Sequence, residues 1–235
     1  GNIALTKVDE DYPDNKLSGA VFEVYSDTNG DGKLDKDDTL LGEMKELDGG
    51  VYQMSELRFG KYLVKETKAP TGFVLDENVY SVSVEENGKT YTVENKAGVG
   101  FINAAQKGSL KIVKTSSDGK VEGFSFRVTG VDYDQTFKTD KNGEIVIEGL
   151  RIGDYTVSEV SNKASAGYIL PADKQATVKV DATAIVQMHN EFRDTPKTGD
   201  DFNLGLWVSL AALSVVGAGV LGFVGYKNRK KKKED

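Results

Sequence analysis

Cysteine is absent from the 235 residues, and histidine, tryptophan and proline are scarce, with one, one and four residues. Without cysteine, an exported form of the chain must be stabilised by means other than disulfide bonds. The one histidine, His189, leaves too few partners for a Ser-His-Asp triad or a zinc site. Runs with the periodicity of an amphipathic helix are also missing, whereas 26 glycines separate short β-branched and aromatic runs. The sequence therefore predicts strands and turns. Residues 1–193 supply no turnover site for an enzyme, so we expect any enzyme activity to lie upstream of them.

Positive charge is concentrated at one end of the chain. The last nine residues carry six basic and two acidic side chains, a net of +4, and because the whole chain carries −7 the rest of it carries −11. An acidic body argues against nucleic acid as a partner. The sequence begins at Gly1 without Met or an apolar leader, so we expect it to be a piece of a longer exported chain.

The one long apolar run lies at residues 204–226, directly before a basic tail at 227–235. At 1.5 Å per residue this run spans roughly 34 Å, enough to cross the hydrocarbon core of a bilayer. Trp207 and Tyr226 lie near its two ends, where amphipathic aromatic rings favour the interface. Positive charge beside a span stays on the cytoplasmic side. We therefore predict a transmembrane helix with the body of the chain outside.

A short motif precedes the span, within a linker at 194–203. Its residues are Thr195, Pro196, Lys197, Thr198 and Gly199. The order of motif, span and basic tail resembles a sortase cell-wall sorting signal, in which Leu usually stands at the position of Thr195. The resemblance implies that a sortase cleaves between Thr198 and Gly199 and transfers the acyl end to an amine of the peptidoglycan cross-bridge or of a neighbouring pilin. The chain would then be anchored in the cell wall after a transient membrane-bound stage. The alternative is a single-span anchor that is never cleaved.

The region before the motif contains one internal repeat. Residues 57–66 and 150–159 are identical at six of ten positions, and GNIALTK at 1–7 parallels GSLKIVK at 108–114. The two copies cover residues 1–105 and 106–193. In the first copy, short runs between Gly, Asn and Asp turns predict strands near 2–9, 20–26, 39–44, 50–54, 60–67, 79–86, 90–94 and 99–104. Strands at this spacing predict an all-β chain with two tandem β-sandwiches.

Three polar residues in each copy fall on the apolar face of a strand. Residues i and i+2 of a strand share a face, so the face that begins with Ile3 and Leu5 continues to a lysine. Equivalent faces of two other strands continue to a glutamate and an asparagine. The six residues are Lys7, Glu66 and Asn103 in the first copy and Lys114, Glu159 and Asn190 in the second. Lys111, a competing amine, has the outward parity. The alternative is that these are unrelated polar residues at the rim of a sheet.

Burial gives such residues a chemistry that they lack in water. A dry core lowers the pKa of a lysine and raises that of a glutamate. The neutral amine is a nucleophile, and a protonated glutamate donates to the asparagine carbonyl and carries protons. Confinement supplies the effective concentration that makes an amide a usable electrophile. The expected product is a Lys–Asn amide, an isopeptide bond, with release of ammonia.

This arrangement resembles the CnaB-like, or SpaA-like, domain of Gram-positive adhesins and pilins, over about residues 1–193. The first copy carries the family's Glu-Thr-x-Ala-Pro-x-Gly-Phe/Tyr stretch at residues 66–73, whereas the second copy is one residue longer there and lacks the proline. The resemblance implies immunoglobulin-like, prealbumin-like β-sandwiches in which isopeptide bonds form spontaneously in a single turnover. The implied bonds are Lys7–Asn103, assisted by Glu66, and Lys114–Asn190, assisted by Glu159.

An acidic loop at residues 27–38 occurs only in the first copy. Its spacing fits an EF-hand-type loop, with oxygen ligands at positions 1, 3, 5, 9 and 12 and glycine at position 6. The predicted Ca²⁺ ligands are the side chains of Asp27, Asn29, Asp31 and Asp38, the carbonyl of Lys33, and Asp35 through water. A short aspartate at position 12 predicts weak binding in the extracellular range, and no motif indicates an organic cofactor. The alternative is a solvated acidic turn.

These features together predict a rigid cell-wall stalk that presents a further region away from the wall. The alternatives are an adhesin module that binds host protein or glycan directly, and a pilin subunit. Residues 12–15 resemble the pilin motif Tyr-Pro-Lys-Asn, but Asp14 replaces the lysine that accepts the next subunit. An exposed apolar or aromatic patch would favour a binding module over a stalk.

Overall fold

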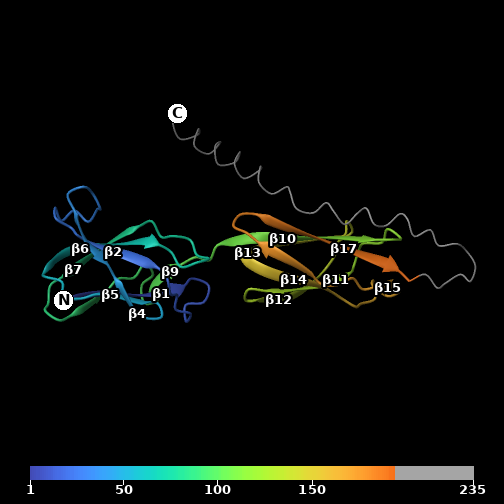
Figure 1. Ribbon diagram of the computed structural model, residues 1–235, viewed down its shortest axis with the longest axis horizontal. Coiled ribbons are helices and arrows are strands. Elements are labelled where there is room, and N and C mark those ends of the chain that lie inside the picture. The colour runs from blue at the N-terminus through green and yellow to red at the C-terminus, as the bar shows by residue number, and fades with distance from the viewer. Residues whose placement is uncertain (194–235) are drawn as a thin grey trace, which may run out of the picture. The chain divides into compact units, whose positions relative to one another are not determined.

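Strands make up the regular structure of residues 1–193, the part of the chain that the computed structural model describes, and no helix forms within it (Figure 1). The all-β prediction is confirmed. The chain divides into two compact units, Gly1–Gln106 and a second that begins at Lys107. No helix among the described residues is long and apolar enough to cross a membrane. The predicted sortase motif, span and basic tail, at 194–203, 204–226 and 227–235, lie outside the described residues.

The first unit is built from two sheets. One has the order β4-β5-β1-β8, with β9 also paired to β1, and the other has the order β3-β2-β6-β7. The strands are β1 (Asn2–Asp9), β2 (Val21–Ser26), β3 (Thr39–Glu43), β4 (Lys45–Asp48), β5 (Val51–Met54), β6 (Gly60–Lys68), β7 (Val79–Val84), β8 (Thr90–Thr92) and β9 (Phe101–Asn103). Strand β4 has no counterpart among the predicted strands, because all four of its residues are exposed and show no alternation of burial.

The second unit repeats this plan with sheets β13-β10-β17-β15 and β12-β11-β14-β16. Its strands are β10 (Lys107–Ser116), β11 (Ser125–Gly130), β12 (Tyr133–Lys138), β13 (Glu144–Arg151), β14 (Gly153–Val160), β15 (Tyr168–Ile169), β16 (Lys174–Val178) and β17 (Thr183–Phe192). In each unit the apolar faces of the two sheets form one core, as expected of a β-sandwich. Each fully buried side chain there contributes about 1.5–3 kcal/mol.

The first and last strands of each unit are parallel neighbours. Strand β10 lies beside β17 (Figure 1) and pairs with it along its length. In this register Lys114 lies opposite Met188. Strand β1 pairs with β9 in the same register, so that Lys7 lies opposite Phe101. In the first unit, however, the last strand is interrupted between β8 and β9 by residues 93–100, whereas β17 is continuous. Both units therefore bring the lysine of the first strand beside the end of the last strand.

Candidate functional site

Three polar side chains lie inside the first unit, at the end of its apolar core. Lys7 follows Ile3 and Leu5 on the inner face of β1, and both Lys7 and Glu66 are 0 % exposed. Asn103, on β9, is 3 % exposed. Strand alternation predicted these residues on the core-facing side of their strands, and their burial agrees with that prediction.

The three side chains of the first unit contact one another directly. Lys7 Nζ donates to Asn103 Oδ1 and lies 3.4 Å from Glu66 Oε1. Asn103 Nδ2 donates to both oxygen atoms of Glu66, at 3.0 and 2.9 Å. Glu66 thus faces the amide nitrogen of Asn103, rather than the carbonyl oxygen that the sequence argument paired with it. In this arrangement the amine lies at one end of the amide and the carboxyl group at the other.

Burial lowers the pKa of Lys7 to about 8, although the nearby carboxylates of Glu66 and Asp76 act in the opposite direction. The Nζ atom also lies 4.6 Å from the centre of the Phe101 ring. An amine with this pKa is neutral far more often near pH 7 than a lysine in water, whose pKa is about 10.4. Lys7 is therefore a potential nucleophile, in contact with an amide.

The second unit contains the equivalent residues in a looser arrangement. Lys114 is 1 % exposed, Asn190 0 % and Glu159 9 %. Asn190 Nδ2 donates to Glu159 Oε1 at 2.9 Å, but Lys114 Nζ donates to the carbonyl oxygen of Thr115. Within residues 1–193, Glu159 Oε2 and Asn190 Oδ1 have no hydrogen-bond partner. The glutamate and asparagine meet here, and the lysine points at its own strand.

Electrostatics in the second unit favour neutral side chains. Burial lowers the pKa of Lys114, against the opposing effect of Glu159 and Asp118. Burial raises the pKa of Glu159, against the effects of its hydrogen bond from Asn190 and the charge of Lys114. Lys114 Nζ lies 4.1 Å from the centre of the Phe124 ring. Both lysines therefore lie on the face of a buried phenylalanine in a site that disfavours the ammonium ion.

Two residues that the sequence argument set aside lie outside both sites. Lys111 faces away from the core and forms an ion pair with Glu144 at 2.7 Å. His189 is exposed and contacts Thr115 Oγ1 at 2.8 Å and Glu191 Oε1 at 3.1 Å. Lys111 has the outward orientation that strand parity predicts, and His189, which directly precedes the buried Asn190 on β17, lies on the outer face for the same reason.

The acidic loop at 27–38 connects β2 to β3, as expected of an insertion between strands. Its carboxylates hold the loop's own backbone: Asp27 accepts from the amides of Gly30 and Gly32 at 2.7 and 3.1 Å, and Asp38 accepts from that of Thr28 at 3.0 Å. No three His, Cys, Asp or Glu side chains of residues 1–193 gather closely enough to hold a metal ion. Calcium binding by this loop stays a prediction.

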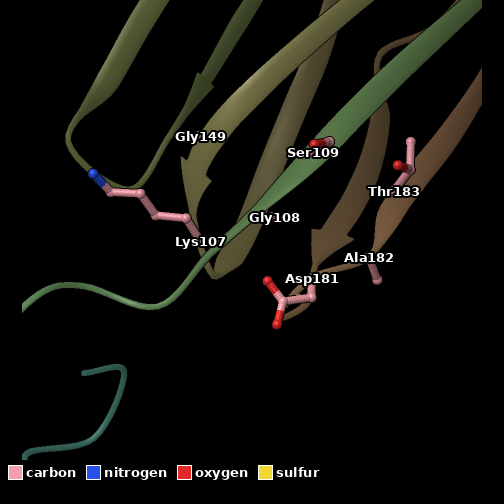
Figure 2. A pocket seen from close by; sticks show the side chains of 7 residues that line it. All are labelled: Lys107, Gly108, Ser109, Gly149, Asp181, Ala182 and Thr183. Atoms are coloured by element: carbon pink, nitrogen blue, oxygen red, sulfur yellow. The ribbon is translucent and has the colours of Figure 1, made fainter. Parts of the chain in front are cut away.

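A shallow pocket of about 340 Å³ lies at the start of β10 (Figure 2). It is lined by Lys107, Gly108, Ser109, Gly149, Asp181, Ala182 and Thr183. Lys114 lies seven residues further along β10, or roughly 23 Å at 3.3 Å per residue. The pocket is therefore at the other end of the strand from the buried lysine and is separate from the candidate site.

Sequence reasoning missed two residues beside the first site. The backbone amide of Asp76 donates to Glu66 Oε2 at 2.8 Å, and Asn95 Nδ2 donates to Asp76 Oδ2 at 2.9 Å. Both residues lie in loops, where no periodicity marks a side chain as inward, and the segment that carries Asn95 is absent from the second copy. A comparison of the two copies therefore identifies the buried triads but not Asp76 and Asn95.

The fold is shared with a solved bacterial protein. The Bacillus anthracis TIE protein is 24% identical, with a TM-score of 0.61 over 82% of this chain, which spans only 34% of that protein. A Streptococcal ancillary pilin is 19% identical over 82% of this chain and 62% of its own, and GBS52, a minor pilin of Streptococcus agalactiae, is 17% identical over 85% and 99%. Their TM-scores of 0.35 and 0.37 are too low to carry an argument. No curated protein sequence matches the chain.

The family comparison covers most of the chain in two segments. Residues 1–97 and 108–192 match SpaA, the prealbumin-like fold domain. The two segments correspond to the two units and contain five of the six residues of the buried triads, all except Asn103. The chain belongs to the SpaA family of prealbumin-like fold domains.

Proposed function

We propose that this chain is the stalk of a Gram-positive surface protein, stapled within each unit by an isopeptide bond that the unit forms itself. The observation that carries the proposal is the contact of Lys7, Glu66 and Asn103 inside an apolar core. Three such groups are expensive to bury, and an ion pair in a dry core adds little net stability. Their burial in contact is explained if they react.

The reaction needs no partner molecule. The neutral Nζ of Lys7 attacks Cγ of Asn103 and forms the new C–N bond. The bond from Cγ to Nδ2 then breaks, and Nδ2 leaves as ammonia. Glu66, whose oxygen atoms lie beside Nδ2, carries the proton that Lys7 loses to this leaving nitrogen. The product is a secondary amide, and the unit reacts once.

The bond would join the first strand of the unit to its last. By analogy with the entropy model for disulfides, closing a loop of about a hundred residues raises the free energy of unfolding by about 4–5 kcal/mol. Tension between the ends of the unit would also pass through this bond and not through the residues between the two bonded side chains. A chain without cysteine would gain in this way the covalent support that disulfides give other exported proteins.

Attachment to the cell wall is the second part of the proposal. A sortase would cleave between Thr198 and Gly199 and join Thr198 to an amine of peptidoglycan or of a neighbouring pilin. The support is the order of motif, apolar run and basic tail in the sequence. The chain would therefore act at the cell surface as a structural protein rather than an enzyme. Thr198→Ala should abolish transfer to a glycine-peptide amine in the presence of a sortase.

The decisive experiment for the staples is the intact mass of the purified, denatured 235-residue chain. We expect a mass lower than that of the sequence by two ammonia molecules, and Lys7→Ala or Glu66→Ala should restore one of them. Lys111→Ala is the matched control on β10: it removes an amine three residues from Lys114 that faces away from the core, so both losses should remain. The full mass of the sequence in the unaltered chain would overturn the proposal.

A further inference from the structure

We propose that Asp76 and Asn95 are positioning residues that hold Glu66 and Asn103 in reacting order in the first unit. This inference rests on the proposed isopeptide reaction. Neither residue touches the reacting atoms with its side chain. They act through a chain of hydrogen bonds that begins at the glutamate and ends beside the asparagine.

Asn95 fixes the strand that carries the electrophile. Its Oδ1 accepts from the backbone amide of Ile102 at 2.6 Å, and its Nδ2 donates to the carbonyl oxygen of the same residue at 2.8 Å. Both backbone groups of Ile102 are thus held by one side chain. Because Ile102 directly precedes Asn103, this pair of bonds fixes the point from which the reacting amide projects.

Asp76 connects this point to the glutamate. Its carboxylate accepts from Asn95 Nδ2 at 2.9 Å and from the hydroxyl of Tyr80 at 2.7 Å, while its backbone amide donates to Glu66 Oε2 at 2.8 Å. Tyr80 in turn packs edge-on against Phe101, with ring centroids 5.1 Å apart. The carboxyl group of Glu66 and the amide of Asn103 must exchange a proton. Both are therefore held by one network of hydrogen bonds made by Asp76 and Asn95, which we call the frame.

The segment that carries Asn95 is held against β1. Val93, at its start, is 3 % exposed, and its amide donates to the carbonyl oxygen of Ala4 at 2.9 Å. Gly100, at its end, has a φ of +135°, and a Cβ there would lie 2.8 Å from the carbonyl oxygen of Thr6. A compact segment anchored at both ends is suited to holding a side chain in a fixed place.

The second unit shows the same triad without this frame. Strand β17 runs continuously from Thr183 to Phe192, so no segment corresponds to residues 93–100. There, Glu159 Oε2 and Asn190 Oδ1 have no hydrogen-bond partner among residues 1–193, and the lysine bonds to a main-chain carbonyl. The preassembled triad and the hydrogen-bonded frame occur together in one unit, and both are missing from the other.

The test is the rate of bond formation in each unit of the 235-residue chain, starting from newly synthesised chain that is collected in denaturant before it reacts and is then allowed to fold. Samples are quenched with acid at intervals, digested, and assayed by mass for the two cross-linked peptides. Asn95→Ala should slow formation of the Lys7–Asn103 bond on the order of 10–100-fold, the range expected for a small misplacement of reacting groups. The rate in the second unit is an internal standard and should not change. Asn87→Ala, in an exposed turn of the same unit, is the matched control and should react at the unaltered rate.

A swap of the two side chains separates positioning from general damage to the fold. Asn95→Asp alone places two carboxylates side by side and should slow the first unit as much as Asn95→Ala. Adding Asp76→Asn restores an amide donor facing a carboxylate acceptor and should recover part of the lost rate. This recovery also covers the case in which Asn95→Ala fails to fold, because the swapped chain retains the hydrogen bond between residues 76 and 95; the recovery is partial because Asp at position 95 cannot donate to the carbonyl oxygen of Ile102.

The outcomes distinguish this inference from the reaction on which it rests. An Asn95→Ala chain that folds and cross-links its first unit at the unaltered rate would contradict it. A swapped chain that reacts no faster than Asn95→Asp would contradict it as well. If the unaltered chain never forms the Lys7–Asn103 bond, the proposed function fails instead.

Discussion

At the scale of single residues, both buried lysines rest on an aromatic ring. Lys7 Nζ lies 4.6 Å from the centre of the Phe101 ring, and Lys114 Nζ lies 4.1 Å from that of Phe124. A ring face attracts a cation and offsets part of the cost of burial, yet burial still lowers the pKa of both lysines. These sites thus admit a lysine but favour its neutral form, which is the form that attacks an amide.

The pKa of Lys7 predicts how the rate of bond formation depends on pH. The proposed reaction passes one proton from Lys7 by way of Glu66 to the leaving nitrogen, so the reacting pair must hold that proton. Movement of the proton within the pair leaves the number of bound protons unchanged. The population able to react therefore does not depend on pH until the pair loses that proton. The pKa of Lys7 is lowered to about 8, so the pair loses the proton as pH rises through about 8. We expect the rate in the first unit to be level just below this pH and to fall above it, as measured by the mass of newly synthesised, unreacted chain that is allowed to fold at different pH values.

A rate that rises steadily through pH 8 and beyond would contradict this expectation, because the amine alone would then control the reaction. The fold must be monitored at each pH by circular dichroism, since an unfolded unit also fails to react. Glu66→Gln is the matched control: it cannot carry the proton, and it should not react at any pH.

At the scale of elements, the parallel pairing of first and last strands makes the chemistry possible. In the second unit eight consecutive residue pairs link β10 to β17, from Ser109–Thr183 to Ser116–Asn190. In the first unit, Asp9 lies opposite Asn103 in the same register. A shift of one residue would turn a lysine or asparagine to the outer face, so the apolar residues before them fix their inward direction.

Strand alternation was sufficient to predict most strands and the burial of both triads, because apolar residues precede each polar one on the same face. It could not predict β4, whose residues are all exposed. It also gave no information on Asp76 and Asn95, which act from loops through hydrogen bonds to other segments. The sequence also could not predict the different orientation of Lys114, because that orientation depends on a side-chain rotation and the two copies have the same residue at this position.

The acidic loop between β2 and β3 supports a prediction about calcium. Its carboxylates hold the backbone turns of the loop, as in the bonds from the amides of Gly30 and Gly32 to Asp27. Because no three carboxylates of residues 1–193 gather closely enough to hold a metal ion, binding would have to draw those of the loop together, and we expect a weak dissociation constant of about 10⁻⁴–10⁻³ M. Calcium titration followed by calorimetry should show one site, which Asp27→Asn weakens. Asp37→Asn, in the same loop but outside the predicted ligand set, should bind as before, and a chain that gives no saturable signal would show the loop to be a solvated turn.

At the scale of the whole molecule, the two staples would determine which parts of the chain carry tension. Force applied at the ends would enter through residues 1–6, cross from Lys7 to Asn103, and continue along β10 to Lys114 and Asn190. The residues enclosed by each bond, including the acidic loop and most of both cores, would carry none of it. Both units would therefore keep their cores while the chain is pulled, which suits a stalk exposed to shear.

Pulling single molecules of the 235-residue chain tests this load path. The 95 residues between Lys7 and Asn103 and the 75 between Lys114 and Asn190 would, if freed, add on the order of 300 and 250 Å of length at about 3.3 Å per residue. We expect neither extension in the unaltered chain, the first alone in Lys7→Ala and the second alone in Lys114→Ala. Lys111→Ala should behave like the unaltered chain because its side chain faces away from the core. Release of either length from the unaltered chain would mean that the corresponding unit is held by its core alone, since an amide bond between the two strands does not break at forces that unfold a β-sandwich.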